Sequence, residues 1–280
     1  MSFFMSLFLG LVQGITEFLP VSSSGHLSIF INIFSLGYSE VEHLLFDVFL
    51  HLGTMVSIFF SYRKDIKAML SDGIGFLRMR SDSDVDEPVV MKPPARALLF
   101  VLVGTIPMII PLIFSGSIAR LFTSVAFIGF AMIVTGGLLY VSDKHIVKGN
   151  KTDKTMTLGD AIIIGLSQAV ASIPGLSRSG ATISVGLARG LSETFAVRFS
   201  LLLSIPAVFG ATVASLYSAI RVGVNFSFFP LYLVGFIIAT VTGFFAIQVL
   251  RRLVKKGGFG KLAYYCWGVG LLAMILSLVV

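Results

Sequence analysis

Two short polar stretches inside an otherwise apolar chain hold the residues that could do chemistry. The first, Gly10 to His26, reads GLVQGITEFLPVSSSGH and carries Glu17, a serine cluster and His26. The second, Gly165 to Ala181, reads GLSQAVASIPGLSRSGA and carries Arg178 between two serines. Serines are preferred helix N-caps, and the first N–H groups of a helix together with a guanidinium bind anions of the phosphate type. These residue types indicate an anion site built by both stretches.

The groups expected to contact the anion lie just before the second helix in each stretch. They are Ser22, Ser23, Ser24 and Gly25 in the first stretch, and Ser177, Ser179, Gly180 and Thr182 in the second. A serine cluster alone is more often a cap than a site. Both clusters, with an Arg, a Glu and a His beside them, favour a site. His26 is expected to reach the same pocket and to transfer protons near neutral pH.

The composition indicates an integral membrane protein. Of 280 residues, 56% are apolar and 12% are charged, whereas about a quarter are charged in soluble proteins. Lys and Arg concentrate in three separate loops, with seven between Arg63 and Arg96, four between Lys144 and Lys154, and five between Arg251 and Lys261. This distribution follows the positive-inside rule and argues against a basic patch for nucleic acid. The single cysteine, Cys266, excludes an intrachain disulfide.

Six apolar stretches are long enough to cross about 30 Å of hydrocarbon. The predicted spans are 42–62, 95–115, 120–141, 194–218, 228–250 and 261–280. The residues around the two polar stretches form shorter pieces, each pair joined at a Pro and a Ser/Gly cluster. We expect them to form re-entrant helical hairpins over 2–36 and 158–189, because non-helical backbone at membrane depth must be buried or face water.

The two polar stretches also repeat each other. Aligned at an offset of 155 residues, they match at Gly10/Gly165, Gln13/Gln168 and Ser22/Ser177, among others. The prediction is an all-α membrane protein of two repeats, 1–141 and 158–280, each a hairpin plus three spans. Three crossings per repeat invert the second repeat relative to the first. With the 63–95, 142–157 and 251–260 loops on the cytoplasmic side, the hairpin tips meet inside the membrane.

Two charges remain at the predicted hairpins. An unpaired Arg178 would cost at least about 2.5–3.5 kcal/mol there, so it needs a partner, and Glu17 is its counterpart in the first hairpin. The pair is either part of a functional site or a salt bridge that merely ties the two repeats together. Asp47 and His51, four residues apart on one helical face, are either supporting partners of the site or polar residues near the interface.

The motifs carry a specific resemblance. QGITEF (Gln13–Phe18), PVSSSGH (Pro20–His26) and PGLSRSGAT (Pro174–Thr182) resemble the two motifs of the undecaprenyl-diphosphate phosphatase family, the bacitracin-resistance BacA/UppP proteins. The likeness extends over nearly the whole chain. Many bacterial members have Glu where this chain has Gln13, which leaves Glu17 as the only carboxylate at the centre of the site.

The resemblance implies hydrolysis of a C55 polyprenyl diphosphate to the monophosphate lipid carrier and inorganic phosphate. It also implies a role in peptidoglycan synthesis, cell shape and bacitracin resistance, a site facing the outside of the plasma membrane, a divalent cation (Mg²⁺ or Ca²⁺) and a homodimer. We expect Arg178, the helix N-termini and the cation to offset the charge of the diphosphate.

The catalytic roles follow as a hypothesis. Ser23 is the candidate nucleophile, activated by Glu17 or His26, although a water could be activated instead. His26 would protonate the leaving group, and Glu17 is assigned either metal ligation, with Gln13 nearby, or general base work. Phosphate oxygens would be bound by the remaining serines and Thr182.

A transporter is the alternative function. Inverted repeats with broken helices at the membrane midplane are common in secondary carriers, and a flippase of a lipid phosphate or a carrier of a small anion would use the same arginine and helix ends. A carrier would not need Glu, Ser and His gathered at one place. It should bind its substrate without hydrolysing it.

Overall fold

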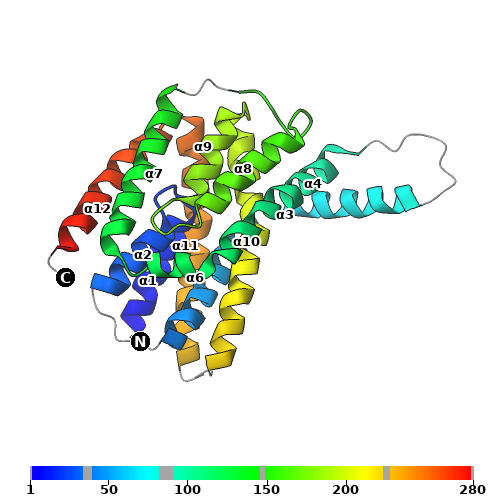
Figure 1. Ribbon diagram of the computed structural model, residues 1–280. Helices are drawn as coiled ribbons and strands as arrows, with labels where there is room; N and C mark the ends of the chain where they lie inside the picture. Colours follow the sequence, from blue (N-terminus) through cyan, green and yellow to red (C-terminus); the bar gives the residue numbers. More distant parts are fainter. Residues whose placement is uncertain (1, 34–39, 82–90, 146–148, 223–227, 279–280) are drawn as a thin grey trace.

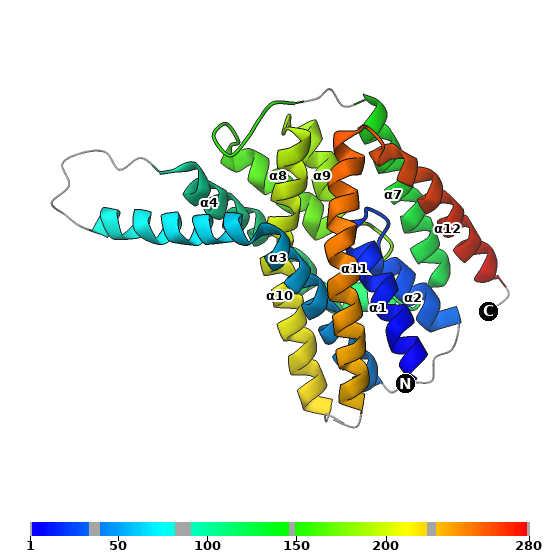
Figure 2. The same ribbon diagram turned by 180° about the vertical axis from the view of Figure 1, so that it is seen from behind.

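The computed structural model describes residues 2–33, 40–81, 91–145, 149–222 and 228–278, and this part of the chain is helical apart from its connections. Figure 1 and Figure 2 show the helices from two sides. In chain order the elements are α1 Phe3–Phe18, α2 Ser23–Ile33, α3 Glu40–Ser81, α4 Pro93–Thr105, η1 Ile106–Met108, α5 Ile109–Ile113, α6 Ser115–Leu121, α7 Val125–His145, α8 Leu158–Val170, α9 Arg178–Ala188, α10 Glu193–Val222, α11 Phe229–Lys255, η3 Phe259–Lys261 and α12 Leu262–Leu276.

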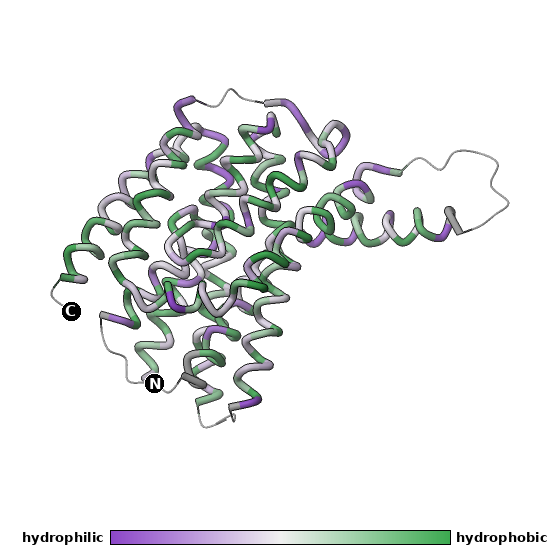
Figure 3. Tube along the Cα trace, viewed as in Figure 1, coloured by the Kyte–Doolittle hydropathy of each residue, from purple (hydrophilic) through white to green (hydrophobic). Residues whose placement is uncertain are grey.

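Six stretches of helix in the described residues are long and apolar enough to cross a membrane, as the sequence predicts. They are Leu44–Arg78, Pro93–Ile113, Val125–His145, Glu193–Arg221, Phe229–Lys255 and Phe259–Leu276. Large apolar side chains such as Phe209 and Phe245 lie exposed on their outer faces. A soluble monomer does not leave so much apolar surface uncovered. Figure 3 shows hydrophobic residues along the helices, with hydrophilic ones at both ends of the bundle and in its middle. The chain is a multi-pass membrane protein.

The prediction that residues 63–95 form a loop is wrong for its first part. Helix α3 continues past the predicted end of the first span to Ser81, with a kink at Tyr62 where the backbone leaves the helical region (φ −122°, ψ 20°). From Leu44 to the kink the helix is about 28 Å long at 1.5 Å per residue, which matches the hydrocarbon thickness. Residues 63–81 form an arm that projects sideways from the bundle (Figure 1, Figure 2). Residues 82–90 of the predicted loop lie outside the described residues.

The predicted spans 95–115 and 120–141 are also corrected in detail. Helix α4 ends at Thr105, and the chain continues through η1 and α5 as short helices around Pro107 and Pro111. Proline lacks the N–H that would continue the helical ladder, and its ring clashes with the preceding turn. A separate helix, α6, then occupies Ser115–Leu121, so α7 begins at Val125 rather than at 120.

Two pairs of short helices replace full spans around the polar stretches. α1 packs beside α2, and α8 packs beside α9. These pairs occupy the predicted hairpins 2–36 and 158–189, except that residues 34–36 lie outside the described part of the chain. The first helix of each pair packs against a long helix from the other half of the chain, α1 against α11 and α8 against α4.

Glycines permit this close packing. A Cβ added at Gly10 would lie 2.8 Å from the carbonyl oxygen of Gly235 in α11, and one added at Gly165 would collide with the carbonyl oxygen of Gly104 in α4. Small residues at helix crossings let backbones approach, which is the main source of helix association in lipid. The two short pairs are held in this way with their connecting turns toward the middle of the molecule.

Candidate active site

The turn between α1 and α2 brings the first serine cluster back beside α1. Helix α1 ends at Phe18, before Pro20, and Ser22 takes a positive φ of 69° that few residues other than glycine adopt. The Ser22 hydroxyl accepts a hydrogen bond from the N–H of Gly25 at 3.2 Å, which is an N-cap interaction. Helix α2 therefore begins at Ser23, and Ser23, Ser24 and Gly25 lie in its first turn rather than before it.

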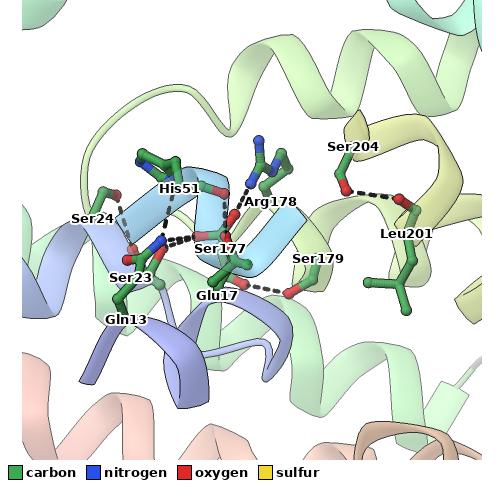
Figure 4. A network of polar contacts seen from close by, with 12 residues as sticks. Gln13, Glu17, Ser23, Ser24, His51, Ser177, Arg178, Ser179, Leu201 and Ser204 are labelled. Atoms are coloured by element: carbon green, nitrogen blue, oxygen red, sulfur yellow. Dashed lines mark hydrogen bonds and ion pairs between the residues drawn. The ribbon is translucent and has the colours of Figure 1, made fainter. Parts of the chain in front are cut away.

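Glu17 is the centre of the polar network. The Ser23 hydroxyl donates to Glu17 Oε2 at 2.6 Å, and Gln13 Nε2 donates to the same oxygen at 3.1 Å. The guanidinium of Arg178 forms an ion pair with Glu17 Oε1. The side chain of Glu17 is 4% exposed and that of Arg178 is 24% exposed. Figure 4 shows these groups converging from α1, α2 and α9. The structure thus brings together three of the four predicted catalytic residues.

Ser177 caps α9 as Ser22 caps α2. Its hydroxyl accepts a hydrogen bond from the N–H of Gly180 at 3.1 Å and lies 3.3 Å from the Ser179 hydroxyl. Thr182 bonds the Arg178 carbonyl at 2.8 Å and lies 2.5 Å from the hydroxyl of Ser200 in α10. Thr182 is therefore engaged within the protein, whereas the first N–H groups of α9 remain without an intrahelical acceptor.

The two turns touch each other. A Cβ added at Gly25 would lie 3.2 Å from the Cα of Gly175, and Gly175 itself has φ +91° with no room for a Cβ beneath the Ile128 carbonyl. Thr135 in α7 fixes the second turn, because its hydroxyl donates to the Gly175 carbonyl at 3.1 Å and accepts from the Ser177 N–H at 3.1 Å. The contact between the turns sets Glu17 and Arg178 face to face.

A small cavity of about 10 Å³, room for about one water molecule, adjoins the ion pair. Its lining consists of Glu17, Phe18, Arg178, Ser179, Ser200, Leu201 and Ser204. Ser200 and Ser204 belong to α10 and were not predicted from the sequence. Two serines one turn apart in an apolar span are the signal that could have found them. A cavity of this size is too small to hold a diphosphate.

His26 is not placed where the sequence analysis expects it. Its Nδ1 lies 2.7 Å from the Ser22 carbonyl, and its Nε2 lies 2.8 Å from the hydroxyl of Tyr265 in α12. Nδ1 must carry the proton to bond the carbonyl, so Nε2 accepts from Tyr265. Both ring nitrogens are occupied, and neither contacts Ser23 or Glu17. Nothing in the sequence around Tyr265 distinguishes it, so this partner was missed.

His51 joins the site through Gln13. Gln13 Nε2 lies 3.2 Å from His51 Nδ1, and His51 Nε2 lies 3.5 Å from Asp47 Oδ2. A polar chain therefore runs from Asp47 through His51 and Gln13 to Glu17. Of the two interpretations of the Asp47–His51 spacing, the geometry agrees with the supporting role.

A divalent cation at this site would need several oxygen or nitrogen ligands. The described residues contain no cluster of three or more His, Cys, Asp or Glu side chains that could hold a metal ion. Gln13 Oε1, however, is buried without a hydrogen-bond partner in the described structure, while Nε2 of the same amide contacts Glu17. Mg²⁺ takes oxygen ligands and is commonly held by one or two carboxylates together with the substrate's phosphates. The residues present fit such a cation when a diphosphate supplies further oxygens.

A family model and several curated relatives match nearly the whole chain. The family model described as bacitracin resistance protein BacA matches residues 6–272. A protein of Desulforapulum autotrophicum is 39% identical over 281 residues, covering 100% of both chains, and one of Halothermothrix orenii is 38% identical over 279 residues, covering 99% of both. A protein of Methanobrevibacter smithii is 37% identical over 282 residues, covering 99% of both. All three relatives are named undecaprenyl-diphosphatase. The chain belongs to the BacA family.

Proposed function

We propose that this protein hydrolyses undecaprenyl diphosphate to undecaprenyl monophosphate and inorganic phosphate. The observation that carries the proposal is the convergence of a serine hydroxyl and a guanidinium on one buried carboxylate, in a chain whose full-length relatives are named undecaprenyl-diphosphatase. The product is the lipid carrier used in peptidoglycan synthesis, and its recycling gives bacitracin resistance. The alternative function, a transporter, is not favoured, because a transporter needs no serine hydroxyl hydrogen-bonded to a carboxylate.

Substrate binding rearranges the ion pair. The terminal phosphate competes with Glu17 for the Arg178 guanidinium, and the first N–H groups of α2 and α9 add further donors. The remaining proposed phosphate contacts are Ser22, Ser24, Gly25, Ser177, Ser179 and Gly180. Thr182 has a different role, because it holds the start of α9 against Ser200. Release from Arg178 leaves the Glu17 carboxylate free to accept a proton.

Ser23 is the proposed nucleophile. Its hydroxyl already donates to Glu17 Oε2 at 2.6 Å, so Glu17 takes the proton as the Ser23 oxygen attacks the terminal phosphorus. The bond from phosphorus to the bridging oxygen breaks, and undecaprenyl monophosphate leaves. Glu17 passes its proton to the departing monophosphate and is a carboxylate again. It then takes a proton from a water molecule that attacks the phosphorus of the phosphoserine, and it returns that proton to the Ser23 oxygen as the bond between this oxygen and phosphorus breaks and inorganic phosphate is released. Arg178 stabilises the negative charge on the transferred group in both steps.

A bound Mg²⁺ or Ca²⁺ would be held by the Glu17 carboxylate and Gln13 Oε1 and would offset the charge of the diphosphate. His26 is proposed to act at a distance from the reacting atoms. It holds the Ser22 carbonyl, and thereby the strained turn that positions Ser23, while Tyr265 fixes its other nitrogen.

The architecture we propose is an inverted repeat, 1–141 and 158–280, with α1–α2 and α8–α9 as re-entrant hairpins. Its support is the exchange of contacts between the halves, in which the paired glycines Gly10 and Gly165 each meet a glycine of the opposite half. Gly129 in α7 and Gly270 in α12, each in the last long helix of its half, also lie against each other. The basic segments then face the cytoplasm, and the site opens to the outer side of the plasma membrane. A homodimer remains a prediction from the resemblance.

The test is phosphate release from undecaprenyl diphosphate by the purified protein in detergent, with EDTA and with added Mg²⁺ or Ca²⁺. We expect cation-dependent release that falls about 10²–10³-fold in Arg178→Ala. Arg221→Lys, Ser218→Ala and the wild type serve as controls, because Arg221 and Ser218 lie at the far end of α10. Absence of release from folded protein under every condition would reject the proposal, and flux of a labelled lipid phosphate in liposomes would then test the carrier.

A further inference from the structure

The arm of α3, residues 63–81, has no explanation in the proposed chemistry. The 42-residue helix α3 is about 63 Å long at 1.5 Å per residue, roughly twice the hydrocarbon thickness. Beyond the kink at Tyr62, the arm runs across the direction of α10 and α11 in both views (Figure 1, Figure 2). A helix that leaves a membrane span and turns sideways at its end lies near the plane of the interface.

The kink is held by contacts with two other helices. The Tyr62 hydroxyl accepts a hydrogen bond from Arg251 of α11 at 3.1 Å, and the guanidinium of Arg251 lies 4.3 Å from the ring centroid. Asp65, one turn further along, pairs with Arg198 of α10 at 3.3 Å. The direction of the arm is therefore fixed at its base.

The charges of the arm are sorted by face. Both acidic residues point toward the protein, where Asp65 pairs with Arg198 and Asp72 lies 3.8 Å from Lys92. The cations whose side chains the structure describes are on the exposed side, and they are Arg63, Lys64, Lys67 and Arg78. Lys64, Lys67 and Arg78 form no ion pair within the described residues. All the charged side chains described on the outward surface are therefore cations.

An exposed apolar stripe runs beside these cations. Leu70, Ile74 and Leu77, spaced at i, i+4 and i+7 on one helical face, are 50%, 51% and 67% exposed. The inner apolar side of the arm is covered, since Met69 is 5% exposed and Gly73 leaves no room against Leu98 of α4. A helix with an open apolar stripe flanked by Lys and Arg is the pattern of a helix that lies in a membrane interface.

We infer that the arm binds the anionic phospholipid headgroups of the adjacent leaflet, with Leu70, Ile74 and Leu77 inserted at the acyl boundary and Lys64, Lys67 and Arg78 on the phosphates. Charge complementarity identifies the partner, because the acidic side chains of the arm are all turned away from this surface. Each cation near an anionic surface favours the docked state by a factor of about five. The inference is independent of the proposed hydrolysis.

The test places single fluorescent labels on the full-length protein in vesicles. Leu77→Cys puts a label on the apolar stripe, and Gly75→Cys puts one on the polar face at a position where an added Cβ meets no other atom. The wild type, whose Cys266 is buried, is the labelling blank. In phosphatidylcholine vesicles with about a third phosphatidylglycerol, we expect the neutral quencher acrylamide to quench the Leu77→Cys label at least about threefold less than the Gly75→Cys label.

Charge removal then separates lipid binding from protein packing. A triple variant that removes the three cations should abolish the protection of the Leu77→Cys label from acrylamide in anionic vesicles. Its substitutions are Lys64→Gln, Lys67→Gln and Arg78→Gln. The matched triple Arg252→Gln, Lys255→Gln and Lys256→Gln, which removes exposed cations at the end of α11, should leave that protection intact. Equal quenching at both label positions in anionic vesicles would overturn the inference, as would protection that is the same in pure phosphatidylcholine.

Discussion

The carboxylate of Glu17 in α1 is paired with the guanidinium of Arg178 in α9, 161 residues away in the chain. Both residues line the small cavity of about 10 Å³ at the site. The pair can be either a strut between the two halves or the resting state of a catalytic site, and these two roles predict different behaviour in paired substitutions.

The first prediction separates stability from activity. Glu17→Gln and Arg178→Gln should each lower the free energy of unfolding by about 2–4 kcal/mol, because each leaves one charge buried without its partner. The double variant Glu17→Gln/Arg178→Gln, with no charge left at the pair, should recover most of this stability and no phosphate release. Thermal unfolding in detergent and turnover would be measured on the same preparations. Activity that returns together with stability would show that the pair is only a strut.

The second prediction concerns Ser23. If its oxygen attacks phosphorus, rapid quenching of a reaction with substrate labelled in the terminal phosphate should trap a labelled phosphoserine at Ser23. Ser23→Ala should lower turnover about 10³-fold and leave no covalent label, because the nucleophile is gone. Ser218→Ala, on the exposed end of α10, is the matched control. Full turnover without a trapped intermediate in the wild type, and near-normal turnover in Ser23→Ala, would assign the attack to a water molecule.

The third prediction concerns Asp160, at the N-terminal end of α8 and outside the six spans. Its carboxylate is 0% exposed and pairs with Lys151 at 3.0 Å and Arg189 at 2.8 Å, which ties the two ends of the α8–α9 pair together. Burial acts to raise the pKa of Asp160, but hydrogen bonds from Lys151, Thr157 and Arg189 outweigh it and lower that pKa from 3.8 to about 2.

The consequence is a pH-dependent contribution to stability. The folded pKa lies below the unfolded one, so the contribution is complete above pH 3.8 and is lost as the pH falls through about 2. Asp160→Asn should lower the free energy of unfolding by about 2 kcal/mol at neutral pH. The difference in the free energy of unfolding between Asp160→Asn and the wild type should shrink as the pH falls from 3.8 to about 2. A difference in melting temperature that stays constant over this range would contradict the prediction.

Much of the fold was readable from composition and spacing. The six spans and the two interrupted pairs follow from apolar length and from Pro and Ser/Gly clusters, which act locally. The continuation of α3 beyond Tyr62 was not predicted from the sequence. Charged residues such as Lys64 and Lys67 suggest a loop, and their helical spacing with Leu70 and Ile74 was not taken into account. The kink itself depends on Arg251, nearly 190 residues away.

The site was predicted to the extent that its residues lie in the motifs. Glu17, Ser23 and Arg178 are brought together as expected from facing turns. His26 was misplaced, because its direction is decided by the Ser22 carbonyl and by Tyr265 in α12, a partner that no motif marks. Ser200 and Thr135 lie outside the motifs, and each reaches the site from a long helix through tertiary packing.

The fourth prediction tests whether His51 supports Glu17 through Gln13. His51→Leu removes the ring nitrogen that lies 3.2 Å from Gln13 Nε2, so Gln13 loses one of the two contacts that orient it on Glu17. A lost hydrogen bond of this kind is worth about 1–1.5 kcal/mol, so kcat should fall about tenfold. KM should change little, because His51 does not reach the phosphate.

Rescue distinguishes positioning from mere packing. His51→Gln keeps a polar group that can bond Gln13, so it should recover most of the kcat that His51→Leu loses, at similar thermal stability. His145→Leu, at the exposed end of α7, controls for the general effect of replacing a histidine. If His51→Leu keeps the wild-type kcat, then Asp47 and His51 are polar residues near the interface with no part in the reaction, and Gln13 is held by Glu17 alone.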